Sequence, residues 1–140
     1  MERPATNQVE AATGHLPADV LVVEDEHVSR KALTTLLQSS GFHPKAFGSA
    51  EDALRQVDDQ SPAIALVDVD LPGMSGLDFV DKLEKMCPQV RAVLITAAAG
   101  ERIDRFMQNH AVMYLRKPLN YPQLLQLLRL LYPSDDKTAS

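Results

Sequence analysis

The residues of this chain best suited to chemistry are polar side chains that follow short apolar segments. In the stretch AIALVDVDLPGMSG, residues 63–76, an apolar run of strand-like composition ends in Asp68 and Asp70. Three other apolar segments also end in polar side chains: Glu24 and Asp25 after DVLVV, Thr96 in VRAVLIT, and Lys117 after VMYLR. Carboxylates, a hydroxyl and an ammonium group together suit metal binding and phosphoryl transfer.

The carboxylates of Glu24, Asp25 and Asp68 would repel one another if the fold brought them together. A proton, a cationic side chain or a hard divalent metal relieves such repulsion. Ligation by oxygen alone favours Mg2+, which keeps several waters and commonly joins one or two protein carboxylates to a phosphate. We therefore expect a Mg2+ site that also accommodates a phosphate group.

Asp68 is the candidate nucleophile of this site. A carboxylate that attacks phosphorus forms an aspartyl phosphate, and the protein contributes mainly alignment and neutralisation of charge. Lys117 can neutralise one phosphoryl oxygen, and Thr96 can donate a hydrogen bond to another. Asp68, Thr96 and Lys117 are therefore the expected catalytic residues.

These residues can meet only if strands and helices alternate along the chain. Short apolar runs predict five strands, at 19–23, 44–47, 63–70, 90–96 and 112–117. Segments of helical periodicity follow each strand, which is typical of an α/β fold with a parallel sheet. Ligands of such sheets bind beyond the carboxyl ends of the strands. The pattern thus predicts that the polar residues converge on one edge.

The predicted helices carry start signals and apolar stripes. Expected N-caps are Ser49, with Asp52 reaching back as in a capping box, Ser75 and Asn120. The first helix carries the apolar residues Val28, Leu33, Leu36 and Leu37, and we expect it to end at Gly41.

Composition excludes several classes of protein. The chain has 140 residues, 45% of them hydrophobic, and a net charge of −5, which suits one globular domain and disfavours direct nucleic-acid binding. No apolar segment approaches the roughly 20 residues of a membrane span, so membrane insertion is not expected. Cys87 is the single cysteine, which fits a reducing, cytoplasmic location. No phosphate-binding glycine motif supports a nucleotide-binding role.

Four segments together resemble the receiver domain of bacterial two-component response regulators: LVVEDE, LVDVDLPGMSGLDF, LITA and YLRKP. They occur in the family's order and close to its usual spacing. The resemblance covers about Asp19 to Tyr132, and the expected organisation is a flexible N-terminal arm at 1–17, a receiver domain at 18–132 and a flexible tail at 133–140. Glu24 stands where aspartate is commoner, and His110 stands where glycine is usual.

The resemblance implies a flavodoxin-like, doubly wound sheet of five parallel strands in the order 2-1-3-4-5, with helices on both faces. It implies that Asp68 is the phospho-acceptor and that Mg2+ is bound by Glu24, Asp25, Asp68 and the backbone carbonyl of Asp70. Thr96 and Tyr114 would be the switch residues. The resemblance further implies a signalling switch with self-catalysed phosphotransfer and autodephosphorylation rather than an enzyme.

The expected phosphoryl donor is a sensor histidine kinase or a histidine phosphotransfer protein. Because the chain ends soon after the last helix, we expect output through a partner or through self-association, unless the chain is a piece of a longer regulator. The segment NYPQLLQLLRLLYP, residues 120–133, is apolar on more than one face, which suggests a homodimer through the last helix.

Two alternatives remain open at this point. In a haloacid-dehalogenase-like phosphohydrolase, Asp68 and Asp70 would be the nucleophile and the general acid. That family, however, places its metal-binding acids after the lysine, where this chain has only Asp135 and Asp136 in the expected tail. The second alternative is a pseudo-receiver that is not phosphorylated and acts only as an interaction module.

Overall fold

The computed structural model describes residues 19–57, 61–98 and 100–132. Five parallel strands form one sheet in the order β2-β1-β3-β4-β5, as predicted. The strands are β1 (Asp19–Val23), β2 (His43–Phe47), β3 (Ile64–Asp68), β4 (Arg91–Thr96) and β5 (Met113–Arg116). The predicted arms at 1–17 and 133–140 lie outside the described residues.

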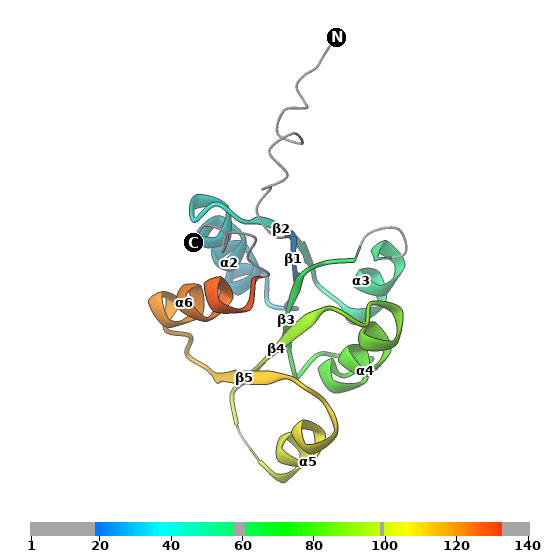
Figure 1. Ribbon diagram of the computed structural model, residues 1–140. Coiled ribbons are helices and arrows are strands. Elements are labelled where there is room, and N and C mark those ends of the chain that lie inside the picture. The colour runs from blue at the N-terminus through cyan, green and yellow to red at the C-terminus, as the bar shows by residue number, and fades with distance from the viewer. Residues whose placement is uncertain (1–18, 58–60, 99, 133–140) are drawn as a thin grey trace, which may run out of the picture.

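Helices cover both faces of the sheet (Figure 1). On one face lie α2 (His27–Ser39) and α6 (Tyr121–Leu131), and on the other lie α3 (Ala50–Gln56), α4 (Gly76–Met86) and α5 (Glu101–Asn109). A hydrophobic core lies on each face of the sheet. Alternate residues of one strand belong to different cores, because successive side chains of a strand point to opposite faces. Val20 and Val22 pack with α2 and α6, whereas Leu21 and Val23 pack on the other side.

The strand register brings the carboxyl ends of the central strands level. Val23 of β1 pairs with Val67 of β3, so the residues that follow β1 emerge beside Asp68. Asp68 in turn pairs with Ile95, the residue before Thr96. Every residue of β3 is buried, as expected for a central parallel strand. A buried strand thus holds Asp68 at a fixed place on the sheet edge.

The helix starts follow the predicted caps. The side chains of Ser49, Ser75 and Asn120 each accept a hydrogen bond from the backbone N–H three residues on. The predicted capping box is only half formed, because the Asp52 carboxylate pairs with Arg55. In α2, Leu33 and Leu37 are buried, whereas Val28, the second residue of the helix, is 70% exposed.

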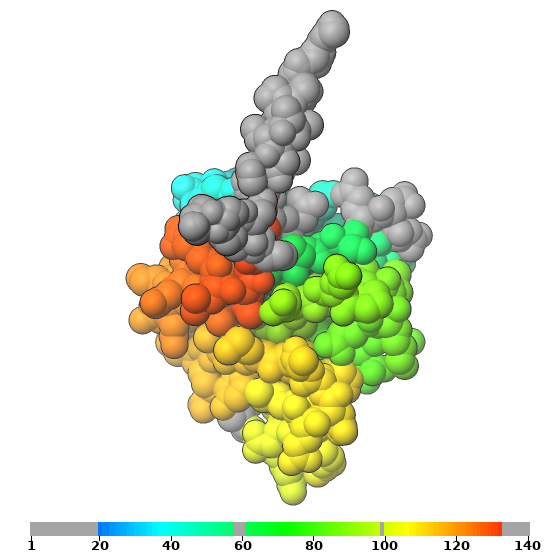
Figure 2. Space-filling view, in the orientation of Figure 1, coloured from blue at the N-terminus to red at the C-terminus, as the bar shows by residue number. Residues whose placement is uncertain are grey.

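The outer surface is built from the helices. In Figure 2 the green residues of α4, the yellow residues of α5 and the orange to red residues of α6 are all visible at the surface. In the described part of the chain, no helix is long and apolar enough to cross a membrane.

Candidate functional site

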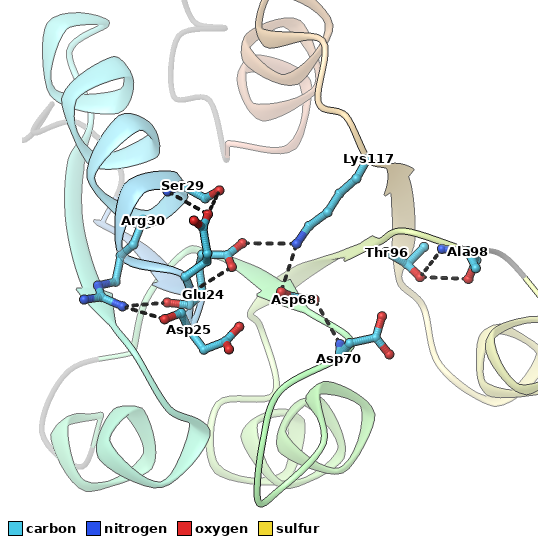
Figure 3. Close-up of polar contacts among 10 residues, drawn as sticks. Glu24, Asp25, Ser29, Arg30, Asp68, Asp70, Thr96, Ala98 and Lys117 are labelled. Carbon is cyan, nitrogen blue, oxygen red and sulfur yellow. Dashed lines mark hydrogen bonds and ion pairs between the residues drawn. The ribbon is translucent and has the colours of Figure 1, made fainter.

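Three carboxylates meet at the carboxyl ends of β1 and β3 (Figure 3). Glu24, Asp25 and Asp68 each offer one oxygen, and these oxygens lie within 4.8 Å of one another. Glu24 and Asp68 are 2% and 3% exposed, whereas Asp25 faces solvent. Oxygen donors that are partly buried and open on one side fit Mg2+, which retains waters in its coordination shell. The predicted convergence of these three residues is confirmed as geometry.

Lys117 reaches this acidic cluster from the end of β5. Its Nζ lies 3.0 Å from Asp68 Oδ2 and 3.5 Å from Glu24 Oε1. The Lys117 backbone N–H donates to the Thr96 carbonyl at 2.8 Å, and a cis peptide bond joins Lys117 to Pro118. The hydrogen bond to Thr96 holds the backbone of Lys117 against the end of β4.

Burial and neighbouring charges shift the pKa values of Glu24 and Lys117. Burial raises the pKa of Glu24, and the nearby Asp68 carboxylate raises it further. The hydrogen bond from the Glu26 N–H and the charge of Lys117 lower this pKa, but they do not outweigh the first two effects. Although partial burial opposes the charged form of Lys117, the two carboxylates raise the pKa of its ammonium group overall. The lysine therefore remains a cation at neutral pH, as required of a partner for phosphoryl oxygens.

The loop after β3 also donates a hydrogen bond to the Asp68 carboxylate. The backbone N–H of Asp70 donates to Asp68 Oδ1 at 2.9 Å, so the two oxygens of Asp68 have different partners. The side chain of Asp70 is exposed, and among the described residues the three-acid group excludes it. Asp70 therefore contacts Asp68 through its backbone, while its side chain faces solvent.

Thr96 ends β4 fully buried, but its hydroxyl does not contact Asp68. It donates to the Ala98 carbonyl at 2.8 Å and accepts from the Ala98 N–H at 3.2 Å. Tyr114 of β5 is partly buried and packs against the core under α3, α4 and α5. The structure therefore brings together the acids and Lys117, and leaves Thr96 and Tyr114 at the side of the site.

Two residues that shape this site were not predicted from the sequence, Arg30 and Gly76. Arg30 of α2 donates to the backbone carbonyls of Glu24 and Asp25. Gly76, at the start of α4, lies against the backbone of Asp68 and Val69. Neither residue breaks a helical pattern, so periodicity carried no signal for either contact.

The model of the response regulator receiver domain family matches residues 20–129. The chain belongs to this family. The matched range contains all the strands but the first residue of β1, together with every predicted site residue. Receiver domains of this family act in two-component signalling, which agrees with the resemblance of the motifs.

Curated relatives of this receiver domain are longer proteins. Nodulation protein W of Bradyrhizobium diazoefficiens is 35% identical over 117 residues, which are 80% of this chain and 52% of that protein. The phosphate regulon transcriptional regulatory protein PhoB of Escherichia coli is 32% identical over 114 residues, 79% of this chain and 49% of that protein. The chain thus spans about half the length of these two relatives.

Solved structures support the same fold. A CheY-like response regulator receiver domain protein from Methanospirillum hungatei superposes with a TM-score of 0.77 at 23% identity, covering 81% of this chain and 92% of that chain. The family match does not favour the haloacid-dehalogenase-like alternative, and the assembled acidic cluster does not favour a pseudo-receiver.

Proposed function

We propose that this receiver domain accepts a phosphoryl group on Asp68. The observation that carries the proposal is the environment of its carboxylate. One oxygen is bound by Lys117 and the other by the Asp70 N–H, and the carboxylates of Glu24 and Asp25 stand alongside. A buried carboxylate with fixed partners is aligned for attack and cannot turn away.

The phosphoryl donor is a phosphohistidine on a sensor histidine kinase or a histidine phosphotransfer protein. An Asp68 oxygen forms a bond to phosphorus, the P–N bond of the donor breaks, and the imidazole leaves with the electron pair. Lys117 faces the phosphoryl oxygens as a fixed cation. The Thr96 hydroxyl exchanges its Ala98 acceptor for a phosphoryl oxygen, and Tyr114 responds as the second switch residue.

The domain catalyses both halves of its cycle. In dephosphorylation, water attacks phosphorus, the P–O bond to Asp68 breaks, and inorganic phosphate and the carboxylate are released. Glu24, Asp25, Asp68 and the Asp70 carbonyl would hold Mg2+, which supplies neutralisation of charge on the transferring group. Phosphorylation then shifts the population of two conformations, and output passes to a partner or to a homodimer through α6.

The α6 surface leaves limited apolar area for such a homodimer. Leu124 and Leu128 are buried against the sheet, whereas Leu130 is 77% exposed and Tyr121 38% exposed. Light scattering over a range of concentrations, with and without phosphorylation, tests dimerisation, and a monomer throughout would count against it. We also propose that residues 18–132 form the receiver domain and that the protein is cytoplasmic.

Intact mass spectrometry tests the proposal. The whole chain is incubated with Mg2+ and a small acyl-phosphate donor such as acetyl phosphate, beside Asp68→Asn. We expect one phosphoryl adduct in the wild type, dependent on Mg2+, and none in the variant. No adduct, where a control receiver reacts, would instead support the pseudo-receiver alternative.

A further inference from the structure

Arg30 clamps the backbone of the acidic pair from behind the site. Its Nη1 lies 2.9 Å from the Glu24 carbonyl oxygen and 3.4 Å from the Asp25 carbonyl oxygen (Figure 3). Its Nη2 lies 3.2 Å from His27 Nδ1. A guanidinium group presents its donors in a rigid plane, so one side chain can hold several acceptors in fixed relation. The contacts of Arg30 with Glu24 and Asp25 are to their backbone oxygens, so Arg30 does not occupy their carboxylates.

The end of β2 leaves room for this guanidinium group. A Cβ atom on Gly48 would fall 2.9 Å from Arg30 Nη1 and 3.5 Å from Arg30 Cζ. The backbone of Gly48 is outside the left-handed region, so its conformation does not require glycine. The neighbouring residue Phe47 accepts a hydrogen bond from the Glu24 N–H at 3.0 Å. The absence of a side chain at position 48 therefore preserves the place of Arg30.

We propose that Arg30 is a positioning residue for the Mg2+ site. It fixes the segment that carries Glu24 and Asp25, so that their carboxylates stay directed toward Asp68. The inference rests on the proposed function, because it assumes that these acids bind Mg2+. Arg30 would act on the metal site only through the backbone of Glu24 and Asp25.

The charge of Arg30 and its hydrogen bonds act on Mg2+ affinity in opposite directions. A cation near the site repels Mg2+, so removal of the charge alone would strengthen Mg2+ binding. Loss of the clamp lets the Glu24–Asp25 segment move, which weakens binding, and loss of an outer-shell partner typically costs about 10-fold or more in metal affinity. The sign of the change thus separates a positioning role from a purely electrostatic one.

Titration of the 15N-labelled whole chain with MgCl2, followed by amide chemical shifts at constant ionic strength, tests the proposal. We expect Arg30→Met to raise the Mg2+ dissociation constant by about 10-fold. Gly48→Ala should raise it in the same direction, because the new Cβ displaces the guanidinium group without a change in charge. Lys31→Met removes a neighbouring exposed cation of the same helix, and should leave binding unchanged or slightly stronger.

The controls separate the possible failures. If Arg30→Met disturbs the fold, Gly48→Ala carries the test, since only the far end of a flexible side chain has to move. Unchanged or tighter Mg2+ binding in folded Arg30→Met or in Gly48→Ala would overturn the positioning role. If the wild type binds no Mg2+ at these residues, the metal site of the proposed function fails instead.

Discussion

Gly76 touches the backbone carbonyl of Asp68. A Cβ atom at position 76 would fall 2.1 Å from the Asp68 carbonyl oxygen and 2.8 Å from the Val69 Cα atom. The Gly76 N–H also donates to the Val69 carbonyl at 3.1 Å. The start of α4 therefore packs directly against the residues that end β3. This contact helps to fix the position of the Asp68 backbone at the sheet edge.

Substitution of Gly76 by alanine should displace this contact. Both clashing groups are backbone atoms and cannot turn aside, so we expect Gly76→Ala to cost about 3 kcal/mol of stability. Phosphorylation of Asp68 should slow as well. Gly100→Ala is the matched control, because a Cβ there meets nothing within 4 Å. Urea unfolding measures both variants, and equal stability of the two would contradict the role given to Gly76.

Lys117→Met should leave two buried carboxylates without their cation. We expect the free energy of unfolding to fall by about 2 kcal/mol, in the range for hydrogen bonds to charged groups. Mg2+ should stabilise the variant more than the wild type, since the metal replaces part of the lost positive charge. Urea unfolding with and without MgCl2 checks both effects, with Lys117→Arg as the control that keeps the charge. A variant as stable as the wild type without Mg2+ would refute the first expectation.

Thr96→Ala should uncouple phosphorylation from the helix that follows. The hydroxyl now bonds the Ala98 backbone, and a phosphoryl group on Asp68 competes for the same proton. We expect the variant to be phosphorylated and to lose about 1 kcal/mol of stability. Its amide shifts in α5 on phosphorylation should be much smaller than those of the wild type. Thr96→Ser keeps the hydroxyl and should retain the shifts, and full shifts in Thr96→Ala would show that the hydroxyl is not needed.

His110, which follows α5, contacts Asp81 of α4 through its imidazole ring. Its Nδ1 lies 3.0 Å from the Phe106 carbonyl and its Nε2 lies 3.1 Å from Asp81 Oδ1, so both nitrogens face acceptors, and only the protonated ring can donate to both. Burial opposes the charge, but these acceptors and the Glu84 carboxylate raise the pKa of His110 overall. The hydrogen bond from His110 lowers the pKa of Asp81, which therefore stays ionised at mildly acidic pH.

The contribution of this contact to stability should depend on pH. Because the pKa of His110 is raised in the folded state, the contribution is complete below about 6.5, the unfolded value, and is lost as pH rises through the folded pKa. We expect the stability difference between the wild type and His110→Gln to be largest at the acidic side of this window. Urea unfolding across the window measures it, and a difference that grows with pH would have the wrong sign.

The fold could be predicted because each level of the sequence pointed to the same arrangement. The buried run of β3 reads as a central strand, and Ser49, Ser75 and Asn120 mark helix starts that the structure confirms. The exposure of Val28 could not be read from the sequence, because Val28 is the second residue of α2 and helical periodicity does not show how far the sheet extends. The burial of residues at the end of a helix or strand depends on neighbouring elements that are distant in sequence.

The site was predictable where it depends on strand ends, and less so where it depends on long side chains. Asp68, Glu24 and Lys117 meet because parallel strands bring their carboxyl ends together. The contacts of Arg30 depend on the conformation of a long side chain, and those of His110 depend on how α5 packs against α4. No spacing in the sequence encodes either. The roles of Thr96 and Tyr114 in switching stay predictions.

Location of the phosphoryl group on Asp68 is the most direct test of the central claim. The phosphorylated whole chain is treated with borohydride, which reduces an acyl phosphate to the alcohol, and is then digested and sequenced by tandem mass spectrometry. We predict homoserine at position 68 after treatment with the phosphoryl donor and Mg2+, and aspartate at Asp25 and Asp70. Reduction at another acidic residue, or unmodified aspartate at position 68 in protein that carries the adduct, would contradict the account.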